Sequence, residues 1–122
     1  KMTKIDIIKE TVRFYSKDAN RRGLNHGGSC QYLTEDGKNC AIGRCIKPSK
    51  FSKIQNHWGT SQLVASTGST NIDSLLSKKY HGHSAAFWSD LQDLHDDSIN
   101  WVNNTISDKG ERQVVRLLQT YK

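Results

Sequence analysis

Apolar residues and proline are both scarce in this sequence. Of its 122 residues, 34% are hydrophobic and one is proline, and the mean hydropathy is −0.72. No apolar run approaches the roughly 20 residues that a helix needs to cross a bilayer, and no stretch has the form of a signal peptide. We therefore expect a cytoplasmic protein that has no membrane partner and keeps its cysteines reduced.

Several motifs that would point to a function are absent as well. The chain has no paired Cys-x2-Cys zinc motif, no phosphate-binding Gly-x4-Gly-Lys loop and no recognised nucleic-acid-binding signature. We expect no bound cofactor. Function has to be inferred from charge, from the placement of cysteine, histidine and aspartate, and from short sequence blocks.

Positive charge is present and unevenly placed. The formal charge is +6; residues 1–53 carry twelve Lys or Arg against five Asp or Glu, whereas residues 54–122 carry six against seven. A basic half can bind nucleic acid or an acidic protein, and it can also serve solubility alone. The candidate contact residues are Arg21, Arg22, Arg44, Lys47, Lys50 and Lys53, with Trp58 as a ring on which a base can stack.

Three helices are predicted from caps and apolar periodicity. Thr3 and Asp6 form a variant capping box ahead of a helix over residues 4–16. Ser84 begins a second helix and Ser107 a third near the end of the chain. The apolar stripe of the second helix consists of Trp88, Leu91, His95 and Ile99.

The stretch of residues 30–46 is predicted to supply a β-hairpin. Residues 30–34 alternate as in a strand, and Asp36-Gly37 is a turn signal because glycine adopts positive φ at low cost. Residues 39–46 return as a second strand or begin a helix.

The segment at about 59–71 is rich in Gly, Ser and Thr and is predicted to form a flexible loop. The chain shows no internal repeat and no low-complexity tail. The expected fold is a single α+β domain over residues 1–122, mainly helical, with four or five helices around one short β-hairpin.

The three cysteines admit catalytic, metal-binding and structural interpretations. A catalytic Cys30, Cys40 or Cys45 needs a nearby base such as His95 and a lowered thiol pKa. A zinc site would draw its ligands from Cys40, Cys45, His81 and His83, although the Cys-x4-Cys spacing is wide for structural zinc. A disulfide between Cys30 and Cys40 is geometrically possible on the predicted hairpin. In a reducing compartment the favoured interpretation is that the thiols pack as small apolar groups.

An aspartate-rich stretch within the second predicted helix contains Asp90, Asp93, Asp96 and Asp97. Asp90, Asp93 and Asp97 share one face, where like charges repel, and carboxylates near a helix C-terminus are disfavoured. Such a row predicts a compensating partner, which can be a basic patch, a divalent metal ion or a ligand. We expect Arg44 to contact Asp96 or Asp97.

Two sequence blocks carry a resemblance to a known family. Cys-x-Tyr, the Asp-Gly turn and Cys-Ala-Ile-Gly-Arg form the first block, and Asp-Leu-Gln-Asp-Leu-His-Asp with the nearby Trp101 forms the second. With these blocks the chain resembles a family of small proteins of tailed bacteriophages, T4-like coliphages among them. The resemblance covers about residues 5–118.

This resemblance implies a small accessory protein that binds a host or defence protein stoichiometrically, as an inhibitor or modulator, in the host cytosol. The basic half and the Asp-rich helix are its candidate contact surfaces. Two alternatives remain open: a nucleic-acid-binding protein that uses the basic half, and a small enzyme that depends on a Cys/His pair or on a metal.

Overall fold

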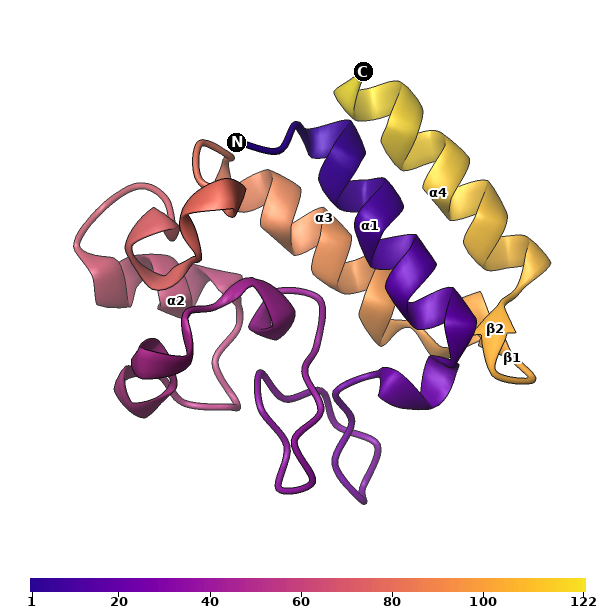
Figure 1. Cartoon of the computed structure of the whole chain (residues 1–122), viewed down its shortest axis with the longest axis horizontal. Helices are drawn as coiled ribbons and strands as arrows, with labels where there is room; N and C mark the ends of the chain where they lie inside the picture. Colours follow the sequence, from indigo (N-terminus) through magenta and orange to yellow (C-terminus); the bar gives the residue numbers. More distant parts are fainter.

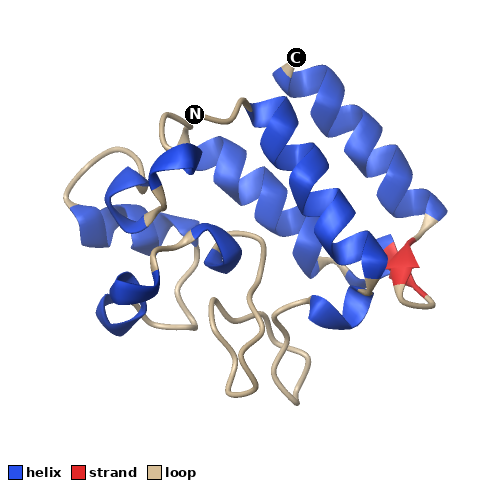
Figure 2. Ribbon diagram, in the orientation of Figure 1, coloured by secondary structure: helices blue, strands red, loops and turns tan.

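The structure, a computed structural model, describes all 122 residues and is mainly helical (Figure 1). Figure 2 shows helices and loops with one short pair of strands, which confirms the expected mainly helical α+β class. The elements are α1 (Lys4–Lys17), α2 (Thr60–Thr67), α3 (Ala85–Asp96), β1 (Trp101–Val102), β2 (Thr105–Ile106) and α4 (Asp108–Tyr121), joined by loops and short 3₁₀ helices.

The three long helices begin at the predicted caps. Thr3 Oγ1 accepts a hydrogen bond from Asp6 N at 3.1 Å, and the Asp6 carboxylate accepts one from Thr3 N at 3.3 Å, which completes the capping box of α1. Ser84 and Ser107 cap α3 and α4 in the same way, each accepting from a first-turn amide. Each cap pairs an N–H group that the helix itself leaves free, so these starts are decided locally.

The helices share one hydrophobic core. In Figure 1, α1, α3 and α4 lie side by side, with α2 and the loops of residues 18–59 on the other side of α3 and α1. Each helix contributes buried apolar side chains, among them Ile7, Ile8, Leu63, Trp88, Leu91 and Leu117. None of the helices has the length and apolar character needed to cross a membrane.

The β-hairpin lies at a different place from the predicted one. It is formed by β1 and β2, with Trp101 opposite Ile106 in an antiparallel pair. Asn103 and Asn104 make its turn with φ angles of 48° and 67°. A two-residue turn with both φ angles positive suits the twist of paired strands, and asparagine tolerates this conformation better than most residues.

Residues 30–46 do not form a hairpin, which corrects the prediction. The Asp-Gly signal does produce a tight turn, since Gly37 has a φ of +83° and Thr34 N donates to Lys38 O at 2.9 Å. Beyond the turn the Asn39 side-chain amide donates to Tyr32 O at 2.8 Å, and Cys40 N donates to Gln31 O at 3.2 Å. Cys30 and Asn39 form isolated bridges with Leu24 and Arg22, so no two-stranded ladder develops between the arms. The chain then forms a short 3₁₀ helix at Gly43–Cys45 instead of a second strand.

The segment at about 59–71, predicted as a loop, contains helix α2. Gly59 precedes this helix, and the Gln62 side chain accepts from Gly59 N at 2.8 Å. Leu63 is fully buried in the core, and Gly68 ends the helix with a φ of +68°. Leu63 and the partly buried Val64 hold this polar segment against the core, and the left-handed glycine ends the helix.

Candidate functional site

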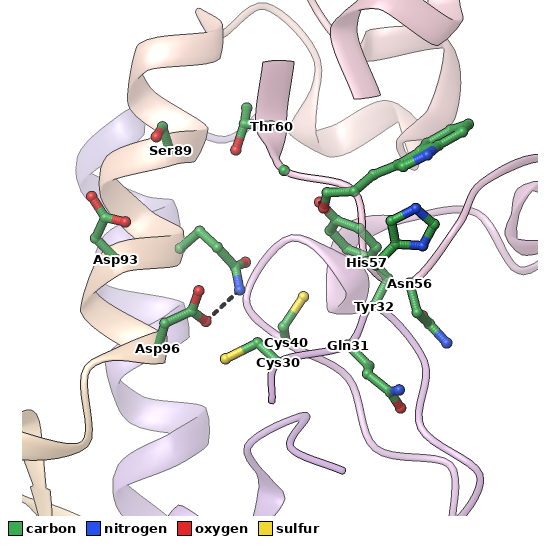
Figure 3. A pocket seen from close by; sticks show the side chains of 13 residues that line it. Cys30, Gln31, Tyr32, Cys40, Asn56, His57, Thr60, Ser89, Asp93 and Asp96 are labelled. Carbon is green, nitrogen blue, oxygen red and sulfur yellow. Dashed lines mark hydrogen bonds between the residues drawn. The ribbon is translucent and has the colours of Figure 1, made fainter. Parts of the chain in front are cut away.

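A cleft of about 340 Å³ lies between α3 and the loops that hold residues 30–40 and 56–60. Figure 3 shows Asp93 and Asp96 on its α3 side and Cys30, Tyr32 and His57 on its loop side. Its lining also includes Cys40, Asn56, Trp58, Thr60, Ser89 and Gln92.

The loop wall of the cleft is held by reciprocal backbone contacts. Asn56 accepts from Leu33 N at 3.2 Å and donates to Leu33 O at 3.0 Å, which ties the loop around residue 56 to the strand-like segment before the Asp-Gly turn. The Tyr32 hydroxyl donates to Trp58 O at 2.6 Å. These bonds fix the loop wall of the cleft, which lies opposite the α3 carboxylates.

Asp96 is the polar centre of the cleft. Its Oδ1 accepts from Gln92 Nε2 at 2.6 Å, drawn as the dashed line in Figure 3, and contacts His95 Nδ1 at 2.7 Å. Gln92 Oε1 accepts in turn from Ile42 N at 3.1 Å. Through Gln92, Asp96 thereby links α3 to the loop of residues 30–46, and the Cys30 thiol lies within 4.8 Å of its carboxylate.

His95 is a buried structural residue whose two ring nitrogens are both engaged. Its side chain is 0% exposed, and Nε2 accepts from Gly23 N at 3.1 Å. A neutral imidazole has one donor and one acceptor nitrogen, so Nδ1 carries the proton and donates it to Asp96. Burial lowers the pKa of His95, which favours this neutral form.

The same bonding argues against His95 as the predicted base for a thiol and against a metal ion at its ring. Cys30, His95 and Asp96 are the one group of potential metal ligands whose atoms lie within 4.8 Å of one another. A metal at Nδ1 would have to displace the proton while Gly23 N still donates to Nε2, which leaves the ring without an N–H group. His95 likewise has no free lone pair with which to deprotonate Cys30.

The thiols are in environments that hold them protonated. Burial and then the neighbouring Asp96 carboxylate raise the pKa of Cys30 well above its usual range. Burial raises the pKa of Cys40 and of Cys45 to about 12. All three cysteines are free thiols. A thiol must ionise to attack a substrate or to bind a metal. Cys40 and Cys45 are buried in the hydrophobic core and fit the predicted apolar packing role, whereas Cys30 is half-buried beside Asp96.

We expect Cys30 to react slowly with an alkylating reagent, although it is only half-buried. At pH 8 its reaction with iodoacetamide should be at least about a hundredfold slower in the folded protein than in urea, because thiolate is the reacting form. Mass spectrometry of the labelled peptides measures both rates. Rapid labelling of Cys30 in the folded protein would restore it as a candidate nucleophile.

The C-terminal end of α3 is met by Arg22 and not by Arg44, which corrects the predicted contact. Arg22 Nε donates to His95 O at 2.8 Å and Nη2 donates to Asp96 O at 3.1 Å. A cation suits the negative end of a helix, where the last carbonyl groups lack partners. Asp97 accepts from Ile99 N at 3.1 Å and so begins the next 3₁₀ turn.

Arg44 pairs with α1 instead of α3. Its Nη2 lies 2.8 Å from Glu10 Oε1, and the Tyr80 hydroxyl donates to the same oxygen at 2.6 Å. The Arg44 side chain is only 14% exposed. It therefore acts within the fold, in a partly buried pair, and does not present a contact surface.

The other predicted residues lie apart from the cleft. His81 and His83 contact the backbone oxygens of Leu76 and Met2, and neither belongs to a cluster with Cys40 or Cys45. Asp90 accepts from the Tyr121 hydroxyl of α4. Arg21 packs over the Phe14 ring, and the 3₁₀ helix Pro48–Lys53 carries three predicted basic residues, Lys50 and Lys53 within it and Lys47 just before it.

Eight lining residues were not among the predicted site residues: Gln31, Tyr32, Asn56, His57, Gly59, Thr60, Ser89 and Gln92. The sequence could have predicted Gln92, because a Gln four positions before an Asp lies on the same helix face and can pair with it, as Gln92 does with Asp96. No such signal exists for Thr60, since its place beside α3 depends on a long-range contact between α2 and α3.

Comparisons with protein-family models, curated proteins and solved structures find no match to this chain.

Proposed function

We propose that this chain is a small phage-type accessory protein that binds a host or defence protein stoichiometrically, with the cleft beside α3 as its contact site. The sequence resemblance supports the class of protein, and the chemistry of the cleft supports the mode of action. The host cytosol is the proposed location.

The observation that carries this proposal is the unpartnered Asp93 carboxylate at the rim of the cleft. Asp93 makes no side-chain hydrogen bond and no ion pair, although the protein has an excess of positive charge. Asp93 is exposed at this rim, and partial desolvation by the surrounding protein, followed by the neighbouring Asp96 and Asp90 carboxylates, raises its pKa. A carboxylate in this environment gains from a cation supplied by another molecule.

The shape and the other walls of the cleft fit a protein side chain as that cation. A volume of about 340 Å³ accommodates a lysine or an arginine and part of its backbone. Trp58 lines the loop wall and is only partly buried, so it can pack against an aliphatic stem. Arginine and aromatic residues are the usual anchors of protein interfaces. The partner that fits is a basic segment of a protein.

Binding is tested by capture from host lysate with the wild-type chain and two charge-reversal variants. We expect Asp93→Lys to reduce capture at least about tenfold, since it places like charge in the contact. Glu111→Lys is the matched control, because Glu111 is exposed on α4, which contributes no residue to the cleft. It should capture as well as the wild type.

Two results would overturn this proposal. Equal capture by the Asp93→Lys variant and the wild type would show that the cleft is not the contact site. A captured set that is lost after nuclease treatment or at high salt would favour the nucleic-acid alternative, because phosphate contacts weaken steeply with salt.

A further inference from the structure

A second cavity of about 360 Å³ lies on the other side of the residue 22–40 loops, beside the β-hairpin. Its wall includes Arg22 and Lys38, the Trp101 ring and the amide side chains of Asn20, Asn103 and Asn104. Ala19 N donates to Asn104 O at 3.0 Å, which fixes the segment after α1 against the hairpin turn. No residue of this wall belongs to the cleft beside α3.

Arg22 is the unusual member of this wall because its charge is buried without a carboxylate partner. The residue is only 8% exposed, and no carboxylate oxygen lies within 4.0 Å of its guanidinium. Asp96 and Asp97 act on it only from further away. Two carbonyl oxygens at the end of α3 are the partners of this guanidinium within the protein, and an anion is the kind of partner that it lacks.

The guanidinium also has a free donor group that the cavity can reach. Nε and Nη2 are used by the carbonyl groups at the end of α3, and Nη1 makes no hydrogen bond within the protein. Nη1 is not among the buried polar atoms left without a partner, so it is accessible to a ligand. The guanidinium is held over the Trp101 ring at 5.8 Å, which orients it.

Lys38 supplies a second cation on the same wall. It makes one ion pair, with Asp36 at 3.5 Å, in which both side chains are largely exposed. Such a pair is weak and exchanges readily. Two cations and several amide donors around one cavity match the oxygen-rich surface of a phosphate group, which arginine binds well through its fork of N–H donors.

We propose that this cavity binds a phosphate group of a nucleotide, with Arg22 and Lys38 as its cationic contacts. The volume exceeds that of a phosphate alone and leaves room for the attached sugar. The nucleotide can be free or part of a single strand, since both present the same phosphate oxygens. This site is independent of the cleft beside α3 and of the protein partner proposed for it.

The test is a titration followed by backbone amide shifts in NMR, with inorganic phosphate, a nucleoside monophosphate and a short single-stranded oligothymidylate as probes. We expect saturable shifts at residues 19–24, 38 and 103–104. If the monophosphate binds with a lower dissociation constant than phosphate, the ligand is a free nucleotide. If the oligonucleotide binds with a lower dissociation constant than the monophosphate, the ligand is a single strand. No saturable shift with any probe at millimolar concentration overturns the proposal.

Two lysine variants distinguish specific binding in this cavity from nonspecific electrostatic binding to a basic protein. Lys38→Ala should weaken binding about tenfold, the effect of losing one charge-assisted hydrogen bond. Lys9→Ala removes the same charge from an exposed position on α1 outside the cavity and should leave the affinity unchanged. An equal loss in both variants, or none with Lys38→Ala, contradicts the site. Arg22→Lys is a further check, with its melting temperature measured because Arg22 also caps α3.

Discussion

Replacement of Gly43 by alanine is expected to lower the free energy of unfolding by about 3 kcal/mol, because overpacking of a buried contact is costly. Gly43 is buried, and a Cβ atom there would overlap Tyr32 O and its carbonyl carbon. Both colliding groups are backbone, so neither can rotate away. The clash can be relieved only by moving the segment that carries Tyr32.

This substitution should also disturb the cleft beside α3, because the Tyr32 hydroxyl is bonded to Trp58 O. The measurement is urea unfolding followed by tryptophan fluorescence. Gly27→Ala is the matched control: Gly27 is exposed, has ordinary φ and has only the Asn25 side chain within contact, at 3.4 Å. It should change stability by less than about 0.5 kcal/mol. Comparable losses in both variants would contradict the role given to Gly43.

Replacement of His95 by alanine is expected to lower the free energy of unfolding by about 4 kcal/mol, because it opens a cavity and leaves buried polar groups without partners. Gly23 N and the Asp96 carboxylate each lose a hydrogen bond. The Tyr15 ring, whose centre lies 4.9 Å from that of His95, loses its neighbour. His57→Ala is the control, since His57 is exposed and has no side-chain bond to lose.

The pH dependence of stability follows from the lowered pKa of His95. Unfolded His95 takes up a proton near its ordinary pKa of 6.5, whereas the folded ring, surrounded by Tyr15, Cys30, Arg22 and Asp96, does so only at lower pH. The unfolded state therefore binds more protons in this range, and the free energy of unfolding falls as pH drops from about 7 to about 5. His83, whose pKa is also lowered by burial, acts in the same direction.

Urea unfolding at a series of pH values checks this dependence. In the His83→Ala protein the free energy of unfolding should still fall with pH nearly as steeply as in the wild type. In the His95→Ala protein most of this pH dependence should disappear. A wild-type stability that is flat between about pH 7 and pH 5 would mean that His95 is not held neutral by burial.

Much of the helical framework was predictable because the signals for it are local. The capping box at Thr3 and Asp6 and the capping serines Ser84 and Ser107 act within one turn of chain. The apolar spacing of α1, α3 and α4 follows from 3.6 residues per turn. The packing role favoured for the cysteines also agrees with the burial and protonation of Cys40 and Cys45.

The β-hairpin and helix α2 were harder to place because their signals compete with others. Asp36-Gly37 makes its turn, but strands also need a continuous ladder, and Asn39 bridges to Arg22 instead. The true hairpin turn, Asn103-Asn104, follows directly on a helical pattern. The polar composition of α2 outweighs the apolar Leu63 and Val64 that hold it.

By itself, the sequence determined the class of fold, the starts of the long helices and the set of residues able to form a site. Only the tertiary structure decided which of them meet: Arg22 rather than Arg44 at the end of α3, Gln92 and His95 on Asp96, and Lys38 beside Arg22. The reason is physical. A cap is settled by neighbours in sequence, whereas a charge or an amide pairs with whichever partner the packing of distant segments brings within reach.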